Sequence, residues 1–362
     1  KSATADDRTR LTADSFPLII TNAGAYRLDE NVRITNAGAH GITIMASDVA
    51  IDLRGKKLTG PGEGAGSCIY QPAGFERLVV SNGVITGWRS DPATLPDNGH
   101  AILARGRHNH LSELYFSSNS VGAELTDFSV ISNSNIEAHE TGIVAGPRSR
   151  VFFCTAFEIG GDAYVLGADT EAFLCTAYSA GLGFRVAGSN VRIVSSTAYS
   201  CAGPGILAAA PSSVLGCAAY SNEIGIQAVA QVRILDAGVN DNRVAGIDAA
   251  SNCVIQGAAS TFNVGDGIRV GADCEVVKSM GNDNGGAGIR MTGGRNLVEG
   301  SQAQRNTWGI WAEGSGNTIV GNQCGGNKAM NFRVEGTNHT VGPILDKQGA
   351  ATNTNDDANF EL

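Results

Sequence analysis

A glycine followed by a large apolar residue recurs about every twenty-one residues through the second half of this sequence. The apolar members lie 20 to 22 residues apart and are Phe184, Ile206, Ile226, Ile247, Ile268, Ile289, Ile310 and Phe332, with Asn331 in the glycine place before the last. A fixed period of this length predicts a solenoid, in which each repeat covers the apolar face of its neighbour. Because many unrelated sites are built on solenoids, the repeat constrains the fold far more than the function.

Each repeat reads as short strands separated by turns. In Ile268-Arg269-Val270 the two apolar residues share one face, so Arg269 points to the other. No segment shows a sustained helical period. Every repeat begins with the same glycine-hydrophobe mark, which predicts that equivalent strands of successive repeats run parallel. Looser marks extend the pattern toward the N-terminus at Ile42, Ile69, Ile102, Ala123, Ile143 and Tyr164. The sequence therefore predicts an all-β solenoid of about fourteen turns of about 21 residues each.

Composition agrees with this fold and excludes some partners. Glycine accounts for 48 of 362 residues and charged residues for only 17%, which suits a chain that turns often. The net charge of −9 disfavours binding to nucleic acid through bulk charge. No apolar run reaches the roughly eighteen residues that a membrane helix needs. We therefore expect no nucleic-acid partner and no membrane insertion.

Several residue types recur in columns at the same period. Cys154 and Cys175 lie one repeat apart, as do Cys253 and Cys274, so each pair is either a disulfide or, as we favour, part of a column of small buried thiols. An asparagine column predicts amides stacked from turn to turn; its members are Asn222, Asn242, Asn263, Asn284, Asn306 and Asn327. An aromatic column, favoured as a structural stack, contains Phe157, Tyr178, Tyr199 and Tyr220.

The chain resembles the right-handed parallel β-helix proteins of the pectate-lyase-like superfamily, and among them the secreted bacterial β-helix repeat proteins. The glycine-hydrophobe mark and the asparagine column carry the resemblance, together with the segments 20–28, 49–55 and 358–360. It implies a right-handed parallel β-helix, a secreted or periplasmic location and a carbohydrate partner. We expect residues 1–40 to form an N-terminal capping segment, 41–342 the β-helix and 343–362 a C-terminal tail.

The outward positions of the ladder suggest a first candidate site. The proposed substrate-binding residues are Arg185, Asp248, Arg269, Arg290, Trp311 and Arg333. Arginines one turn apart repel one another, so something must compensate their charge. One alternative is an anionic polysaccharide whose carboxylates pair with arginine while Trp311 stacks on a sugar ring. The other, slightly favoured, is a solvated face neutralised by Asp248, Glu313 and Glu335.

A second candidate site lies near two insertions, at residues 60–67 and 89–98, which lengthen the steps between Ile42, Ile69 and Ile102. His100, Arg105 and Glu124 are candidates for acid–base catalysis there, and Asp248 and Arg269 are weaker candidates on the ladder. A purely structural role is favoured for the histidines.

The resemblance implies particular chemistry. Lyases with this fold use a carboxylate-bound calcium and a base that removes the proton next to a uronate carboxylate, whereas hydrolases use clustered aspartates. Neither pattern is complete here, so calcium is only a possible cofactor and catalysis is uncertain; an epimerase or hydrolase is less favoured than a lyase. We carry three hypotheses: a lyase acting on an acidic polysaccharide by β-elimination, a non-catalytic glycan-binding protein, and a structural surface protein.

Overall fold

The computed structural model describes residues 7–90, 98–209, 211–345 and 357–362. The chain divides into two compact units, Lys1–Thr176 and Ala177–Leu362. The regular secondary structure of the described residues is β-strand throughout, apart from a single short 3₁₀ turn, η1, at Ala13–Ser15. The predicted all-β class is therefore confirmed. None of the described helical residues forms a segment long and apolar enough to cross a membrane.

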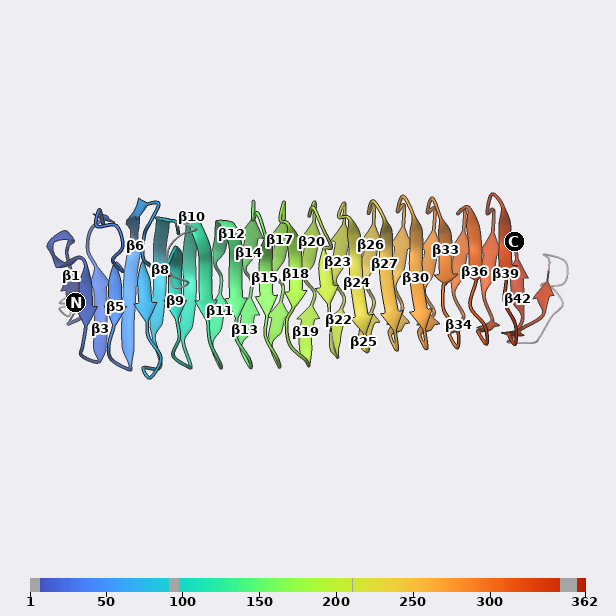
Figure 1. The fold of residues 1–362 in the computed structure, drawn as a ribbon, viewed down its shortest axis with the longest axis horizontal. Helices are drawn as coiled ribbons and strands as arrows, with labels where there is room; N and C mark the ends of the chain where they lie inside the picture. The colour runs from blue at the N-terminus through green and yellow to red at the C-terminus, as the bar shows by residue number, and fades with distance from the viewer. Residues whose placement is uncertain (1–6, 91–97, 210, 346–356) are drawn as a thin grey trace, which may run out of the picture. The chain divides into compact units, whose positions relative to one another are not determined.

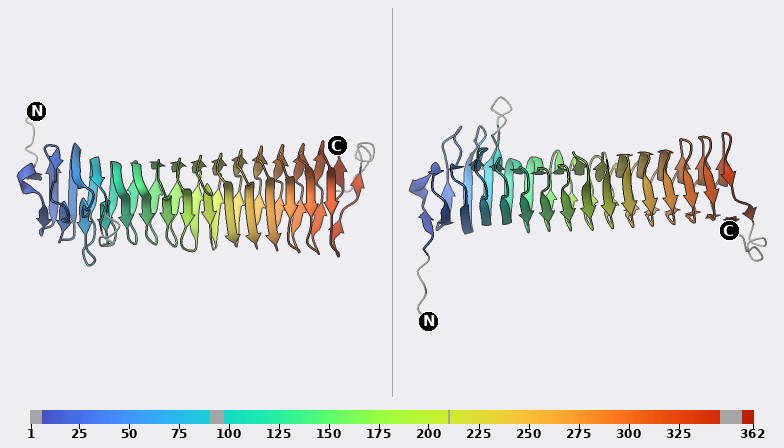
Figure 2. Two further views of the ribbon diagram at one scale, coloured as in Figure 1. Left: turned by 45° about the horizontal axis from the view of Figure 1, so that its top comes forward. Right: turned by 90° about the horizontal axis from the view of Figure 1, so that it is seen from below.

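Each regular turn of the second unit contains three strands. One turn has β27 (Ala245–Ser251), β28 (Val254–Gln256) and β29 (Ala259–Thr261), and the next has β30 (Asp266–Ala272), β31 (Glu275–Val277) and β32 (Met280–Asn282). Equivalent strands pair in parallel, with Ile247 opposite Ile268 and Ile255 opposite Val276. β24, β27 and β30 consequently lie side by side in both figures (Figures 1 and 2). The predicted parallel solenoid is confirmed.

The glycine-hydrophobe mark, or a looser form of it without the glycine, lies at or near the start of the first strand of each turn, and we call these strands the first row. In the first unit this row comprises β2 (Leu18–Ile20), β5 (Ile42–Ile44), β7 (Ile69–Gln71), β9 (His100–Ala104), the end of β10 (His110–Leu125), the end of β12 (Asn135–Ala145) and β15 (Asp162–Leu166). In the second unit it comprises β18 (Leu182–Val186), β21 (Ile206–Ala208), β24 (Ile224–Ala230), β27, β30, β33 (Ala287–Met291), β36 (Trp308–Ala312) and β39 (Met330–Val334). The described residues thus form about 15 turns, one more than predicted, because Leu18 pairs with Ile42.

The inward residues of the first row form the core of each unit. Ile247, Ile268, Ile289 and Ile310 are fully buried in the second unit. In the first unit, a buried tryptophan explains one glycine: a Cβ on Gly60 would lie 2.5 Å from the Gly87 carbonyl oxygen and 2.8 Å from the Trp88 ring. Close approach of two chain segments therefore requires glycine at this position.

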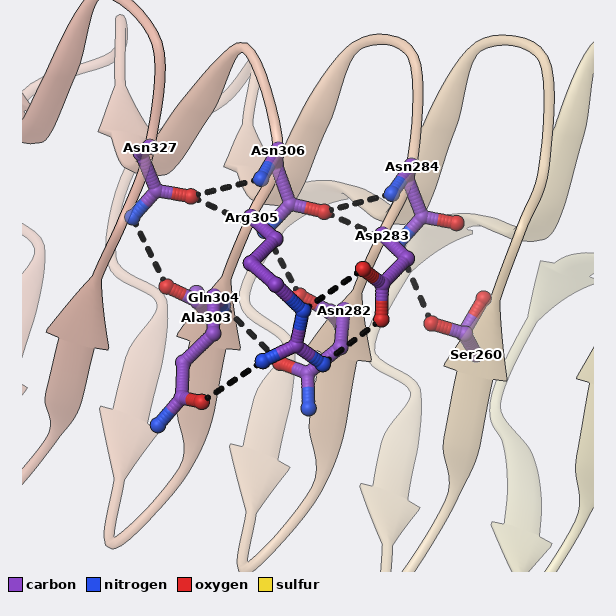
Figure 3. A network of polar contacts seen from close by, with 10 residues as sticks. Ser260, Asn282, Asp283, Asn284, Ala303, Gln304, Arg305, Asn306 and Asn327 are labelled. Atoms are coloured by element: carbon purple, nitrogen blue, oxygen red, sulfur yellow. Dashed lines mark hydrogen bonds and ion pairs between the residues drawn. The ribbon is translucent and has the colours of Figure 1, made fainter.

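The asparagine column is a continuous hydrogen-bond ladder (Figure 3). The backbone N–H of Asn284 donates to the Oδ1 of Asn306 at 2.8 Å, and Asn306 donates in the same way to Asn327. The Nδ2 of Asn284 also donates to the Ser260 carbonyl at 3.1 Å. Each asparagine thereby satisfies buried groups of its own and neighbouring turns, as the stacked-amide prediction requires.

The other columns are also structural. All eight cysteines are free and buried, in agreement with packing by small thiols, and burial raises the pKa of the Cys217 thiol to about 11. The rings of Tyr178 and Tyr199 stack with their centroids 5.2 Å apart, and those of Tyr199 and Tyr220 with centroids 5.1 Å apart.

Candidate functional site

The predicted ladder of outward residues is continuous in the second unit. Strand register aligns Gln227 with Asp248, Asp248 with Arg269, and Arg269 with Arg290. We call the whole row the Arg–Trp strip; its members are Arg185, Leu207, Gln227, Asp248, Arg269, Arg290, Trp311 and Arg333. Ile268 and Val270 are fully buried while the Arg269 side chain is 33% exposed, so the inside–outside assignment is confirmed.

Acidic side chains compensate the arginines at the centre of the strip. Arg269 holds Asp248 with two hydrogen bonds, from Nε at 2.9 Å and from Nη2 at 2.6 Å. The hydrogen bond with Asp248 raises the pKa of the Arg269 guanidinium, against the opposing effect of burial. Such bidentate pairs fix the plane of the guanidinium.

Arg290 bridges two carboxylates from neighbouring turns. Its Nη1 lies 3.3 Å from Asp266 and its Nη2 lies 2.8 Å from Glu313. Burial alone would lower the pKa of Arg290, but the hydrogen bond with Glu313 and the charge of Asp266 together raise it. Asp266 also accepts a hydrogen bond from the backbone N–H of Ala287 at 2.8 Å, which holds it in place.

Trp311 lies at the centre of a cluster of cations and aromatic rings. The guanidinium carbons of Arg290 and Arg333 each lie 4.3 Å from the centroid of its ring, and these residues come from the turns on either side. Trp308 packs against it with ring centroids 4.8 Å apart. The cations therefore stabilise the ring through its π-electrons and occupy space that a sugar ring stacked on Trp311 would need.

Glu335 completes this cluster. It accepts hydrogen bonds from Arg333 Nη2 at 2.6 Å and from the indole N–H of Trp311 at 3.3 Å. The hydrogen bond from Arg333, followed by that from Trp311, lowers the pKa of the Glu335 carboxyl. Among the described residues of the strip and its border, three arginines, Arg269, Arg290 and Arg333, pair with four carboxylates, those of Asp248, Asp266, Glu313 and Glu335. Acidic side chains therefore compensate the charge of these three arginines.

The second set of candidates comes together in the first unit. His100 on β9 and Glu124 on β10 lie on paired strands, and His100 Nε2 is 3.2 Å from Glu124 Oε2. The hydrogen bond with His100 and, after it, the charges of His100 and Arg105 lower the pKa of Glu124, while partial burial opposes them. His100 is only 4% exposed and Glu124 is 36% exposed, so Glu124 is the member of the pair that a ligand can reach.

Sequence reasoning missed Asp266 and Trp308, which border the strip and contact Arg290 and Trp311. Each is the first residue of its strand and precedes the glycine of its own mark, so strand alternation assigns it to the inward face with Ile268 or Ile310. The position two residues before the apolar member of the mark recurs in every turn, and His100 holds it in its own turn. That recurrence was the signal that could have identified Asp266 and Trp308. Within the part of the chain that the structure describes, no three His, Cys, Asp or Glu side chains gather as a metal ion requires.

Comparison with known proteins supports the fold. The family model described as "Right handed beta helix region" matches residues 119–274. The match covers less than half of the chain, and together with the parallel turns described above it defines the fold as a right-handed parallel β-helix. No curated protein sequence matches the chain.

Solved structures with a similar fold share little sequence with this chain. The A-module of the Azotobacter vinelandii mannuronan C-5 epimerase AlgE6 is 14% identical, with a TM-score of 0.44 over 88% of this chain and 91% of that one. The periplasmic alginate epimerase AlgG is 11% identical, with a TM-score of 0.39 over 98% and 83%. The catalytic unit of the GH87 alpha-1,3-glucanase from Streptomyces thermodiastaticus is 13% identical, with a TM-score of 0.35 over 88% and 63%.

Proposed function

We propose that this chain is a polysaccharide-binding β-helix protein and that the Arg–Trp strip is its binding surface. The observation that carries the proposal is the cross-linked array of Arg269, Arg290, Trp311 and Arg333 with its carboxylates. Sugar hydroxyls donate and accept hydrogen bonds, and this array offers guanidinium donors beside carboxylate acceptors. Its side chains are held by one another, which reduces the entropy lost on binding.

The repeat distance of the strip also suits a polymer. Adjacent turns are separated by the strand spacing of about 4.8 Å, which is comparable to the length of one sugar residue in an extended chain. Because the strip carries its own carboxylates, its geometry favours a neutral or sparsely charged polysaccharide over a polyuronate. An anionic polysaccharide remains the competing hypothesis. A secreted or periplasmic location is consistent with either partner and is part of the proposal.

Electrophoresis through native gels containing single polysaccharides tests this proposal. The panel should include neutral glucans and mannans as well as alginate and polygalacturonate. We expect at least one polysaccharide to retard the protein, and Arg290→Ala or Trp311→Ala to weaken that interaction roughly tenfold. Arg295→Ala is the matched control, since Arg295 pairs with Asp273 away from the strip. Equal retardation of all three variants, or no retardation of the parent protein, contradicts the proposal.

A lyase is the second candidate function, and the His100–Glu124 pair with Arg105 nearby is the observation that favours it. β-Elimination needs a base for the proton next to the uronate carboxylate and a cation for the carboxylate itself. Glu124 and Arg105 supply these groups, while the burial of His100 suits it better to orienting Glu124. Incubation with polyuronates, with and without calcium, should then produce ultraviolet absorbance from an unsaturated product, and Glu124→Gln should abolish it. A flat trace for the parent protein removes this candidate.

A further inference from the structure

The second row of strands in the second unit contains a hollow over one strand. β19 (Val191–Val194), β22 (Ser212–Leu215) and β25 (Val232–Leu235) lie in register, with Ser213 opposite both Arg192 and Arg233. β22 has two serines where each neighbour has valine followed by arginine. Two short side chains leave space that longer ones fill elsewhere, and the hollow measures about 310 Å³.

The lining of this hollow is polar and positively charged. Arg192 and Arg233 flank Ser213, and Asn190, Pro211 and Gln231 complete the rim. No acidic side chain is among these residues. Both arginines are exposed, and their Cα atoms are two strand spacings apart, or roughly 10 Å. An anionic group entering over Ser213 therefore meets positive charge and small polar groups.

Arg233 differs from the other arginines of the second unit. Arg269, Arg290 and Arg333 hold carboxylates on the strip, and Arg295 and Arg305 hold Asp273 and Asp283 at turns. Arg243 donates to the carbonyl of Ala202 at 2.6 Å. Arg233, by contrast, forms no side-chain hydrogen bond or ion pair with any residue that the structure describes. Its five donors are available to a planar oxyanion.

We propose that this hollow binds the carboxylate of an acidic saccharide, at a site separate from the Arg–Trp strip. The Arg233 guanidinium would take the carboxylate with two parallel hydrogen bonds. Ser213, Asn190 and Gln231 would hydrogen-bond the hydroxyls beside it. This proposal stands independently of the strip, because it rests on the second row of strands and on a different charge balance: the strip contains its own carboxylates, whereas the lining of the hollow contains none.

Calorimetric titration of the full chain with trigalacturonate tests the proposal. We expect binding to weaken roughly tenfold or more in Arg233→Ala, to recover in part in Arg233→Lys, and to weaken in Ser213→Leu, which fills the hollow. Arg295→Ala should bind like the parent protein. The melting temperature of each variant, compared with that of the parent, verifies that the fold is intact.

Three further arms separate the alternatives. Cellotriose, a neutral trisaccharide, should not bind at the hollow, and sodium sulfate should bind more weakly than trigalacturonate. Sulfate that binds as tightly would mean that any oxyanion suffices, which overturns the saccharide assignment. Loss of trigalacturonate binding in Trp311→Ala together with normal binding in Arg233→Ala would assign that ligand to the strip and overturn the proposal. If the strip variants Arg290→Ala and Trp311→Ala bind polysaccharide like the parent protein in the gel experiment, the proposed function is contradicted but the proposal for the hollow is not.

Discussion

In the second unit the first-row hydrophobes lie 20 to 22 residues apart, whereas steps of 27 and 33 residues separate Ile42, Ile69 and Ile102 in the first unit. The regular unit satisfies its buried amides with copies of the same residue one turn away, as Asn263, Asn284 and Asn306 do. In the irregular unit, the whole buried amide of Gln71 lacks a partner among the described residues, as do single atoms of Trp88 and His100, whereas in the regular unit only Ser212 Oγ and Arg290 Nε do.

This difference shows what repetition does for a β-helix. A side chain that recurs in every turn finds its hydrogen-bond partner in the next copy, so a buried polar column adds stability. An inserted loop breaks the recurrence and leaves single polar groups such as His100, which are not held by a column. Chemical reactivity is therefore easier to build in the irregular unit, and an extended binding surface in the regular one.

The largest effect on stability is expected when one side-chain amide is removed from the asparagine ladder. In Asn284→Ala, the backbone N–H of Asn263 loses its acceptor, and Asn306 Oδ1 loses the side-chain donor Nδ2 of residue 284 while keeping the backbone donor. We expect the free energy of unfolding to fall by roughly 2–4 kcal/mol, measured by urea unfolding. Asn240→Ala is the control, because the amide of Asn240 bonds only the exposed side chain of Asp241 at 2.7 Å, and it should cost less than about 0.5 kcal/mol. Equal losses in the two variants would contradict the ladder's role.

Gln71, in the first unit, has a buried amide without a partner in the described part of the chain, in contrast to the paired amides of the asparagine ladder. Its amide is fully buried, and neither its nitrogen nor its oxygen has a partner among the described residues. Gln71→Met replaces this unpaired amide with an apolar chain of similar size, so stability should stay equal or rise by about 1 kcal/mol. A loss of more than about 2 kcal/mol in urea unfolding would show that the amide is paired after all.

The pH dependence of stability tests the ion pair of His100 and Glu124. The pKa of Glu124 is lowered from the ordinary value of 4.5, chiefly by the hydrogen bond with His100. Its contribution to stability is thus present above about pH 4.5 and is lost as the pH falls through the lower pKa of the folded state. Glu124→Gln should destabilise by roughly 0.5–1 kcal/mol at pH 6 and by less at pH 3. Glu299→Gln, at an exposed site in the second unit, should show no such difference, and a pH-independent loss in Glu124→Gln would argue against the pair.

The smallest effect is expected at the turn pair of Asp283 and Arg305 (Figure 3), which lie 2.7 Å apart. Arg305 is exposed, so solvent screens the pair. Arg305→Ala should leave the urea midpoint unchanged within error. A clear shift would mean that turn ion pairs, and not only the asparagine ladder, hold the regular unit together.

Much of the fold follows from the sequence because the period assigns every residue of a regular turn to the inside or outside. Burial of Ile268, exposure of Arg269 and the stacking of Asn284 follow from that assignment alone. His100 and Glu124 could be paired because they lie about one turn apart.

The sequence could not predict features that depart from strand alternation or depend on missing volume. Asp266 is the first residue of β30, where alternation places it on the face of Ile268, yet its carboxylate reaches Arg290. The hollow over Ser213 arises from two short side chains, which produce no pattern of their own. The compensation of Arg290 by Glu313 could be named only as one of two alternatives, because the two depend on side-chain geometry rather than on spacing.

Tryptophan fluorescence tests the central claim most directly, because two of the three tryptophans, Trp308 and Trp311, lie on the strip while Trp88 is buried in the first unit. Titration with a polysaccharide that retards the protein should change the emission saturably. The change should vanish in the double variant Trp308→Phe with Trp311→Phe, which retains Trp88. A saturable change that persists in the double variant, or retardation without any change in the parent protein, would contradict binding at the Arg–Trp strip.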